Sequence, residues 1–140
     1  MIALVDASIW SLALRRNQEH LNTVQRASVH ALHQLVTAGG ARMIGPVRQE
    51  LLSGISQPSK FEKIRVALQA FLDEPLNTLD YEEAARANNQ CRVKGVTVTA
   101  VDILLCAVAI RREWAIFSAD PDFHHYRSVL PLTLYTPSTE

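Results

Sequence analysis

The chain has 140 residues, 48% of them hydrophobic, and its 14 basic and 14 acidic side chains give a formal net charge of zero. This length suits one compact domain, and the balanced charge excludes a general attraction to nucleic acid, so any polyanion must be bound locally. The apolar runs are shorter than the roughly 20 residues that cross a bilayer, and the N-terminus reads as a strand rather than a signal peptide. We therefore expect a cytoplasmic protein.

The N-terminal part of the chain predicts a buried strand followed by a long helix. Residues 2–5 form a continuous apolar run that ends at Asp6, which is typical of a central parallel strand buried on both faces. Apolar residues then recur at helical spacing from about residue 18 to residue 38, and Gly39 and Gly40 supply a C-terminal stop.

The central part predicts a short strand and two helices. Residues 41–44 are a strand candidate, and Pro46 then opens a helix that carries Glu50. After a loop at residues 56–59, apolar residues at helical spacing predict a further helix over residues 61–71.

The C-terminal part predicts two more helices. Asp80 and Glu83 have the spacing of a capping box that opens a helix running to Gly95. Thr99 starts another helix, which extends to about Arg112 and is apolar nearly all round, so we expect it to pack between other elements.

Two last strand candidates lie at residues 115–118 and 132–135. Strands that alternate with helices along the whole chain indicate an α/β sandwich over a mostly parallel sheet. Cys91 and Cys106 fall inside helical patterns without a CxxC spacing or a neighbouring histidine. We therefore expect buried thiols rather than zinc ligands or a disulfide.

Four acidic residues have mostly apolar or small neighbours at element boundaries: Asp6, Glu50, Asp102 and Asp120. Asp6 and Asp120 follow strands, and ligands of open α/β sheets bind beyond the carboxyl ends of the strands. Asp102 opens its helix and Glu50 borders the apolar stripe of its own, so all four could converge on one cleft.

Converging carboxylates need a partner, because two such charges about 4 Å apart repel by about 4 kcal/mol at an effective dielectric of about 20. Protonation or a bound cation would neutralise them. A set of oxygen ligands without histidine or cysteine favours magnesium or manganese over zinc. A water activated by such an ion attacks phosphodiesters, which is nuclease chemistry.

Each acid also has a purely structural interpretation. Asp6 could form an Asx turn, and Asp102 could complete a capping box with Thr99. Asp120 could cap the helix that follows it, and Glu50 could be a solvated helix residue. No single acid therefore indicates a metal site, and only the four together support that interpretation.

The segments around these acids form four blocks: Leu-Val-Asp-Ala-Ser-Ile-Trp at 4–10, Pro-Val-Arg-Gln-Glu-Leu-Leu-Ser-Gly at 46–54, Asp-Ile-Leu-Leu-Cys-Ala-Val-Ala at 102–109 and Ser-Ala-Asp-Pro-Asp-Phe at 118–123. In this order and at these separations the blocks resemble the PIN-domain family, specifically the VapC-type ribonuclease toxins of type II toxin–antitoxin systems. The resemblance spans nearly the whole chain.

The resemblance implies a three-layer α/β/α sandwich with a central, mostly parallel sheet, formed by a single PIN domain over residues 1–140. It implies an endoribonuclease that hydrolyses RNA phosphodiester bonds with a water activated by Mg²⁺ or Mn²⁺. The implied catalytic residues and metal ligands are Asp6, Glu50, Asp102 and Asp120. The implied additional site residues are Asp122, which could equally cap a helix, and the hydroxyls of Ser8 and Ser118.

The resemblance also implies a cognate antitoxin, whose segment lies in an apolar groove near the active site, and a homodimer. The helix over residues 18–38 and the stripe of Phe61, Leu68 and Phe71 could line this groove, although the same periodicity fits ordinary core faces. The candidate contacts to RNA phosphates are Arg15, Arg16, Arg92 and Lys94.

Two alternatives remain. A phosphatase with a nucleophilic aspartate at position 6 would normally have a second aspartate two residues later, where this chain has Ser8. A non-catalytic PIN fold that only binds RNA or protein would not need all four acids.

Overall fold

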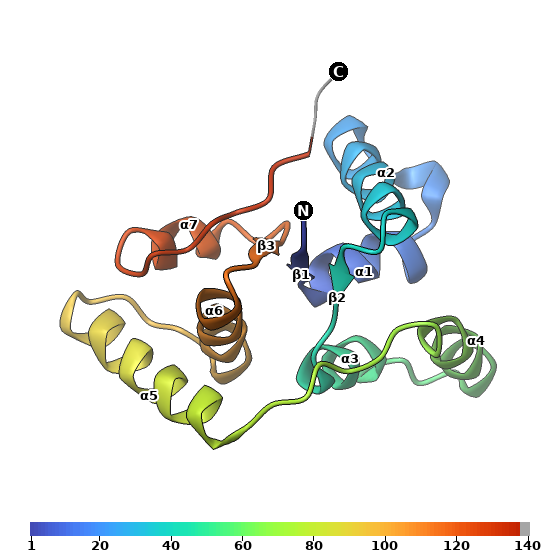
Figure 1. The fold of residues 1–140 in the computed structure, drawn as a ribbon. Helices are drawn as coiled ribbons and strands as arrows, with labels where there is room; N and C mark the ends of the chain where they lie inside the picture. The colour runs from blue at the N-terminus through green and yellow to red at the C-terminus, as the bar shows by residue number, and fades with distance from the viewer. Residues whose placement is uncertain (138–140) are drawn as a thin grey trace.

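The computed structural model describes residues 1–137, in which seven α-helices and one 3-10 helix surround a three-stranded sheet (Figure 1). The strands are β1 (Ala3–Val5), β2 (Ala41–Arg42) and β3 (Ala115–Phe117). Their order is β2-β1-β3, and both pairs are parallel. The expected domain, residues 1–140, extends by three residues beyond the described part.

The helices are α1 (Ala7–Leu14), the 3-10 helix η1 (Gln18–His20), α2 (Thr23–Thr37), α3 (Gly45–Leu52), α4 (Pro58–Leu68), α5 (Thr78–Val93), α6 (Ala100–Arg112) and α7 (Asp122–Arg127). In Figure 1, α1 and α2 lie on one side of the sheet, whereas α5, α6 and α7 lie on the other. The predicted three-layer α/β/α arrangement is therefore confirmed. Within the described residues, no helix is long and apolar enough to span a membrane.

The core lies where β1 and α6 meet. All three residues of β1 are fully buried, which confirms the predicted central strand. Seven consecutive residues of α6, from Ile103 to Ala109, are buried, because this helix packs against β1 and β3 on one side and α5 on the other. Cys91 and Cys106 are free thiols buried in this layer, as expected.

The helix predicted over residues 18–38 is interrupted. The chain forms η1, leaves helical geometry at Leu21 and restarts at α2. The restart is explained by a capping box, in which the Asn22 side chain accepts from the Gln25 backbone and the Gln25 side chain accepts from the Asn22 backbone. Helix α1, which immediately follows Asp6, was not predicted.

The capping box predicted for Asp80 and Glu83 was wrong. The box is formed one turn earlier, because the Asn77 side chain accepts from the Asp80 N–H while the Asp80 carboxylate accepts from the Asn77 N–H. Pro58, placed in a loop from the sequence, instead lies in the first turn of α4.

The strand predicted at residues 132–135 contributes only a parallel bridge between Leu134 and Ile116. Backbone bonds from Ile116 N to the Thr133 oxygen (2.8 Å) and from Tyr135 N to the Ile116 oxygen (2.7 Å) hold this segment beside β3. It therefore lies where the sequence placed it, without forming a regular strand.

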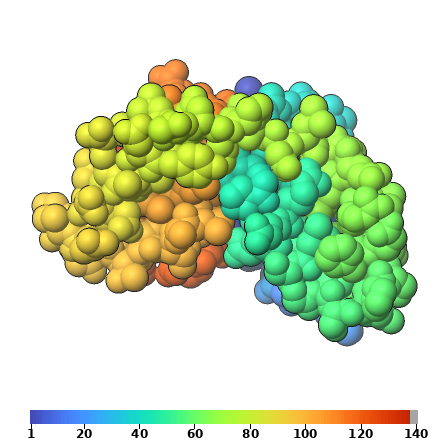
Figure 2. Space-filling model, turned by 90° about the horizontal axis from the view of Figure 1, so that it is seen from below, coloured from blue at the N-terminus to red at the C-terminus, as the bar shows by residue number. Residues whose placement is uncertain are grey.

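The connection from α4 to α5 is fastened to α3. Arg48 donates from Nε to Asp73 at 3.0 Å, and the Glu74 N–H donates to the Met43 oxygen at 2.8 Å. Figure 2 shows this yellow-green connection running alongside the teal residues of α3. Helix α5 is thereby directed to the far side of α6.

A buried carboxylate then locks α5 onto α6. Asp80 is fully buried, and it accepts hydrogen bonds from Arg111 and from both Nη atoms of Arg112 (2.9 and 3.1 Å). Arg112 also donates to Glu74 at 3.2 Å. The hydrogen bond from Arg112 is the largest cause that lowers the pKa of Asp80 to about 2, with burial acting in the opposite direction.

We predict that Asp80→Asn lowers the free energy of unfolding by about 3 kcal/mol, because it leaves two arginines without their buried partner. The low folded-state pKa means that Asp80 stabilises the fold above its ordinary pKa of 3.8, and that this contribution is lost as the pH falls through about 2. In urea unfolding, the free energy of unfolding should therefore fall less between pH 7 and pH 2 for the variant than for the wild type.

The matched control is Glu83→Gln, which breaks the more exposed pair of Glu83 with Arg86 at 3.3 Å. This change should cost less than about 0.5 kcal/mol. Equal losses in both variants would contradict the importance of the buried pair.

Candidate functional site

The four acids singled out in the sequence line one cavity, of about 350 Å³, at the carboxyl ends of β1 and β3. Asp6 directly follows β1, and Asp120 is the third residue after β3. Asp102 comes from the first turn of α6, and Glu50 comes from α3. The complete lining is Asp6, Ala7, Ser8, Ser11, Arg15, Glu50, Leu51, Thr99, Asp102, Asp120 and Asp122.

Asp6 is nearly buried and held on both carboxylate oxygens. Oδ1 accepts from the N–H of Ala7 at 2.8 Å, at the start of α1. Oδ2 accepts from the hydroxyls of Ser8 at 2.9 Å and Ser118 at 2.7 Å. Asp6 therefore caps α1, a helix that was not predicted, where the sequence offered an Asx turn, and it is also tied to the loop after β3.

The two serines also fix that loop. Ser8 Oγ accepts from the N–H of Ala119 at 3.0 Å, and Ser118 Oγ accepts from the N–H of Asp120 at 3.0 Å. Asp120 then accepts from the N–H of Asp122 at 2.9 Å, just where α7 begins. Each serine links a carboxylate to a backbone group, so the backbone carrying Asp120 is positioned by the same network that orients Asp6.

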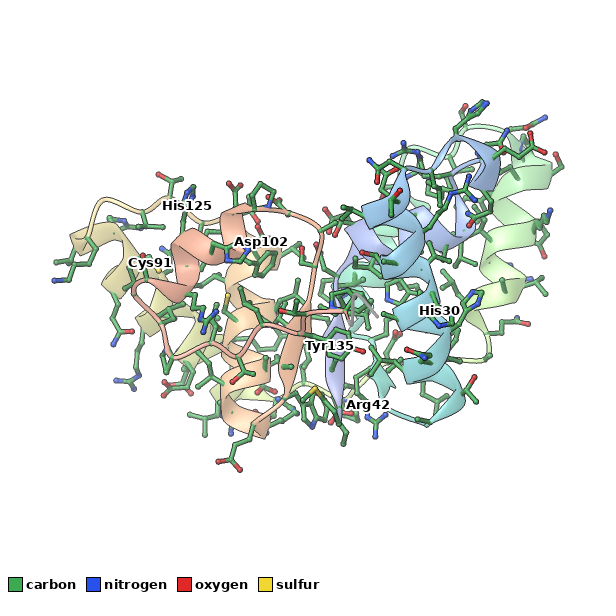
Figure 3. All side chains as sticks on the ribbon, turned by 90° about the horizontal axis from the view of Figure 1, so that it is seen from above. His30, Arg42, Cys91, Asp102, His125 and Tyr135 are labelled. Carbon is green, nitrogen blue, oxygen red and sulfur yellow. The ribbon has the colours of Figure 1, made fainter. Side chains whose placement is uncertain are left out.

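Asp102 is held by hydrogen bonds with Thr99 and Tyr126. Its N–H donates to Thr99 Oγ1 at 3.2 Å, which is one half of the predicted capping box. Its carboxylate accepts a hydrogen bond at Oδ2 from the hydroxyl of Tyr126, at 2.8 Å, rather than turning back to Thr99. Figure 3 shows Asp102 on α6, next to α7, which carries Tyr126.

Tyr126 was missed from the sequence. It lies 24 residues from Asp102, inside the polar run His124-His125-Tyr126-Arg127 that reads as a solvated helix. The residues next to Tyr126 in the sequence give no pattern that predicts its burial, because this burial depends on how α7 lies against α6. Burial is the largest cause that raises the pKa of Tyr126, followed by its hydrogen bond to Asp102, so the phenol keeps its proton.

The cavity carboxylates influence one another electrostatically. Burial is the largest cause that raises the pKa of Asp102, and the charges of Asp6 and Asp120 raise it further, while Tyr126 opposes them. Partial burial followed by the charges of Asp6 and Asp102 raises the pKa of Glu50, although most of that side chain is exposed. The four predicted acids therefore form one electrostatic group.

The donor set fits a hard divalent cation, since it consists of carboxylate and hydroxyl oxygens with one basic side chain, Arg15, on the wall. The side chains do not form a finished coordination sphere. Within residues 1–137, no group of three or more His, Cys, Asp or Glu residues is placed to hold one metal ion. The cavity thus offers oxygen ligands that suit a hard divalent cation, but the described side chains do not converge on one ion.

The other candidate residues lie elsewhere. Arg16, Arg92 and Lys94 are exposed and do not belong to the described lining of the cavity, so Arg15 is the one phosphate candidate that the structure places there. Two histidines of α7 also lie near the site: His125 is exposed, with Nδ1 3.8 Å from Asp122, and His124 lines a neighbouring cavity.

This neighbouring cavity, of about 580 Å³, is mostly apolar and adjoins the carboxylates at Asp120. It lies between α2, β3, α7 and residues 134–137; Figure 3 labels two of its residues, His30 and Tyr135. Helix α2 therefore faces a groove, as the resemblance implied. Leu68 and Phe71 do not: Leu68 is fully buried, and the Phe71 ring packs 4.8 Å from that of Trp10.

We predict that Asp102→Asn stabilises the metal-free protein at pH 7 by about 1 kcal/mol, because it removes one repelling charge from a partly screened group. A carboxyl whose pKa is raised in the folded state loses stability as the pH rises above its ordinary value. The stability difference between variant and wild type should therefore grow from pH 4 to pH 7 in thermal unfolding with chelator present.

Asp122→Asn is the matched control, since Asp122 is an exposed acid at the edge of the same cavity. It should change stability by less than about 0.5 kcal/mol. A metal-free Asp102→Asn protein that is less stable than wild type at pH 7 would contradict mutual repulsion.

Comparisons with known proteins agree with this architecture. The family described as PIN domain matches residues 3–129. Comparison with the curated proteins finds no match.

Among solved structures, the chain resembles FitAcB from Neisseria gonorrhoeae, with a TM-score of 0.76, 18% identity and 98% of each chain covered. It also resembles VapBC2 from Rickettsia felis bound to a promoter DNA fragment, with a TM-score of 0.71, 17% identity and coverage of 96% of this chain and 98% of that one. A toxin–antitoxin complex from Klebsiella pneumoniae gives a TM-score of 0.59 and 16% identity, covering 86% and 89%. At these identities the structures show a shared fold. The family match over residues 3–129 shows that the chain belongs to the PIN-domain family.

Proposed function

We propose that this PIN domain is a magnesium-dependent endoribonuclease and the VapC-type toxin of a toxin–antitoxin pair. The observation that carries the proposal is the cavity at the ends of β1 and β3, where Asp6, Glu50, Asp102 and Asp120 come together from four segments of the chain. Besides burial, the charges of Asp6 and Asp102 raise the pKa of Glu50, and those of Asp6 and Asp120 raise the pKa of Asp102, so a bound cation would offset this repulsion. The whole chain, residues 1–140, would then be one PIN domain.

The four acids would bind the cation in two ways, directly or through water. Asp6 and Asp102, the two acids held by hydrogen bonds from side chains, would bind Mg²⁺ or Mn²⁺ directly, and Glu50 and Asp120 would act through bound waters. Magnesium keeps several waters and often takes only one or two carboxylates, so converged ligands are not required beforehand. The cation would activate a water and stabilise the charge that develops on the phosphate.

The remaining polar residues support this arrangement. Ser8 and Ser118 would orient Asp6 by the hydrogen bonds described above. Asp122, at the edge of the cavity, would bind an outer water. Arg15 would contact a phosphate of the RNA strand, because it is the cation on the cavity wall.

The hydrogen bonds around Asp6 disfavour the phosphatase alternative. An aspartate nucleophile normally works with a second aspartate two residues later as its acid or base, whereas Ser8 stands at that position and donates its hydroxyl to Asp6. The competing hypothesis is a PIN fold that only binds RNA or protein. RNA cleavage by the wild-type protein, and its loss in the acid variants, distinguishes a nuclease from such a module.

We predict that Asp6→Asn and Asp102→Asn each reduce magnesium-dependent RNA cleavage by about a thousandfold, because several kcal/mol of charge stabilisation depends on the cation. The same changes should abolish growth arrest on expression in cells. The measurement is cleavage of total RNA by purified protein with Mg²⁺ and with chelator, followed by mapping of the new RNA ends.

Glu83→Gln on α5, outside the cavity, is the control and should cleave as wild type does. Undiminished cleavage by a folded Asp6→Asn or Asp102→Asn protein would contradict the proposed nuclease function. Wild-type protein that binds RNA without cleaving it would favour the non-catalytic module.

The apolar cavity beside the carboxylates supports an antitoxin partner. The solved structures that share this fold include a toxin–antitoxin complex from Klebsiella pneumoniae. A segment of a partner protein lying between α2 and α7 would bury this apolar wall and approach Asp120, where it could block the site. We propose that this partner is a cognate antitoxin, that the toxin itself is a homodimer, and that both act in the cytoplasm, where RNA is found.

We predict that Val24→Lys weakens binding of the antitoxin, sought as the product of the adjacent upstream gene, by at least about tenfold, because it places a charge on an apolar contact. Val24 lines the cavity yet is 75% exposed, so the fold should tolerate the change. Calorimetric titration of the two purified proteins measures the effect. Val93→Lys, at a similarly exposed position on α5, should bind normally; equal weakening by both would contradict the location.

A further inference from the structure

Tyr126 approaches the carboxylate site from the protein interior. Its side chain is 2% exposed, and its hydroxyl donates to Oδ2 of Asp102 at 2.8 Å. Asp102 lines the cavity, whereas Tyr126 is absent from the lining found among residues 1–137. The phenol therefore contacts the acid without facing the space in which a cation or substrate would lie.

The position of this hydroxyl is fixed by packing. The Tyr126 ring meets the ring of Phe123 edge-on, with centroids 5.1 Å apart and planes at 75°, and Phe123 is itself buried. Both residues lie on α7, whose start is tied to the carboxylate of Asp120 through the N–H of Asp122. A ring with so little freedom can fix the rotation of the carboxylate that it contacts.

The two buried sides of the cavity are supported differently. Asp6 is oriented by Ser8, Ser118 and the N–H of Ala7. Asp102, on α6, accepts a hydrogen bond at its carboxylate from Tyr126, which another helix supplies, and a hydrogen bond from the Thr99 side chain also lowers the pKa of Asp102. Loss of the Tyr126 hydroxyl would remove the buried donor from Asp102 and leave the hydrogen bonds to Asp6 in place.

We propose that Tyr126 is a positioning residue for the metal site: its hydrogen bond to Oδ2 fixes the rotation of the Asp102 carboxylate, and therefore the direction in which this carboxylate faces a cation. This inference rests on the proposed function, since it assigns Asp102 to the cation. Residues that orient metal ligands by hydrogen bonds typically change metal affinity about 10- to 100-fold when they are altered.

Tyr126→Phe removes the hydroxyl and keeps the ring that packs on Phe123. We expect its dissociation constant for Mg²⁺, measured calorimetrically without RNA, to rise about tenfold. Cleavage should fall at low Mg²⁺ and recover when Mg²⁺ is raised by the same factor. A purely structural role would instead lower the melting temperature in chelator and would not be rescued by Mg²⁺.

The matched control is Tyr135→Phe, whose ring lies in the neighbouring cavity and packs on Phe117 at 4.7 Å. Its affinity for Mg²⁺ should equal that of wild type. If Tyr126→Phe does not fold, Phe123→Leu decides, because it keeps the hydroxyl and releases the ring: weaker Mg²⁺ binding supports the proposal, and unchanged binding overturns it.

The experiment distinguishes failure of the proposed metal site from failure of the proposed role of Tyr126. If wild type binds no Mg²⁺, the metal site itself is wrong, and the role of Tyr126 falls with it. If wild type binds Mg²⁺ and Tyr126→Phe binds it equally well, only the role of Tyr126 is overturned, and the nuclease assignment stands.

Discussion

The hydrogen bond from Ser118 to Asp6, at 2.7 Å, joins the ends of two neighbouring strands, and the site depends on it. It can form because β1 and β3 are parallel and in register, so their carboxyl ends coincide. The buried β1 leaves no other place for Asp6 than the end of the sheet, where the first residues of α1 cap it. Pairing of the backbone thus brings together two polar segments that are 112 residues apart in sequence.

The same residue type is used in two opposite ways in this molecule. Asp80 is fully buried, but two arginines surround it, and its pKa is lowered to about 2. Asp102 is partly buried, and its pKa is raised, chiefly by that burial and further by the charges of Asp6 and Asp120. A compensated charge holds α5 against α6, whereas the charges of Asp6 and Asp120 oppose ionisation of Asp102. This contrast, rather than acidity alone, distinguishes the structural carboxylate from the candidate functional one.

The sequence predicted those parts of the fold and site that are marked locally. Asp6 directly follows an apolar run, and Asp102 opens an apolar helix, so both could be placed from their neighbours. The break at Asn22 was not predicted, and the cap of α5 was placed at Asp80 instead of Asn77, because caps of similar spacing compete over a few residues. Tyr126 could not be found at all, since its role depends on α7 packing against α6, which no periodicity in a six-residue helix specifies.

The lack of converged ligands follows from the way the site is supported. Asp6 and Asp102 are held rigidly, by serines on one wall and by a buried phenol on the other. Glu50 has no comparable support, because it projects from the short helix α3 and is mostly exposed. A cation entering between the two fixed acids would relieve their repulsion and could draw Glu50 inward at little cost, since an exposed side chain reorients freely. Asp6 and Asp102 would then determine where the ion sits, and the exposed Glu50 would complete its shell once the ion is bound.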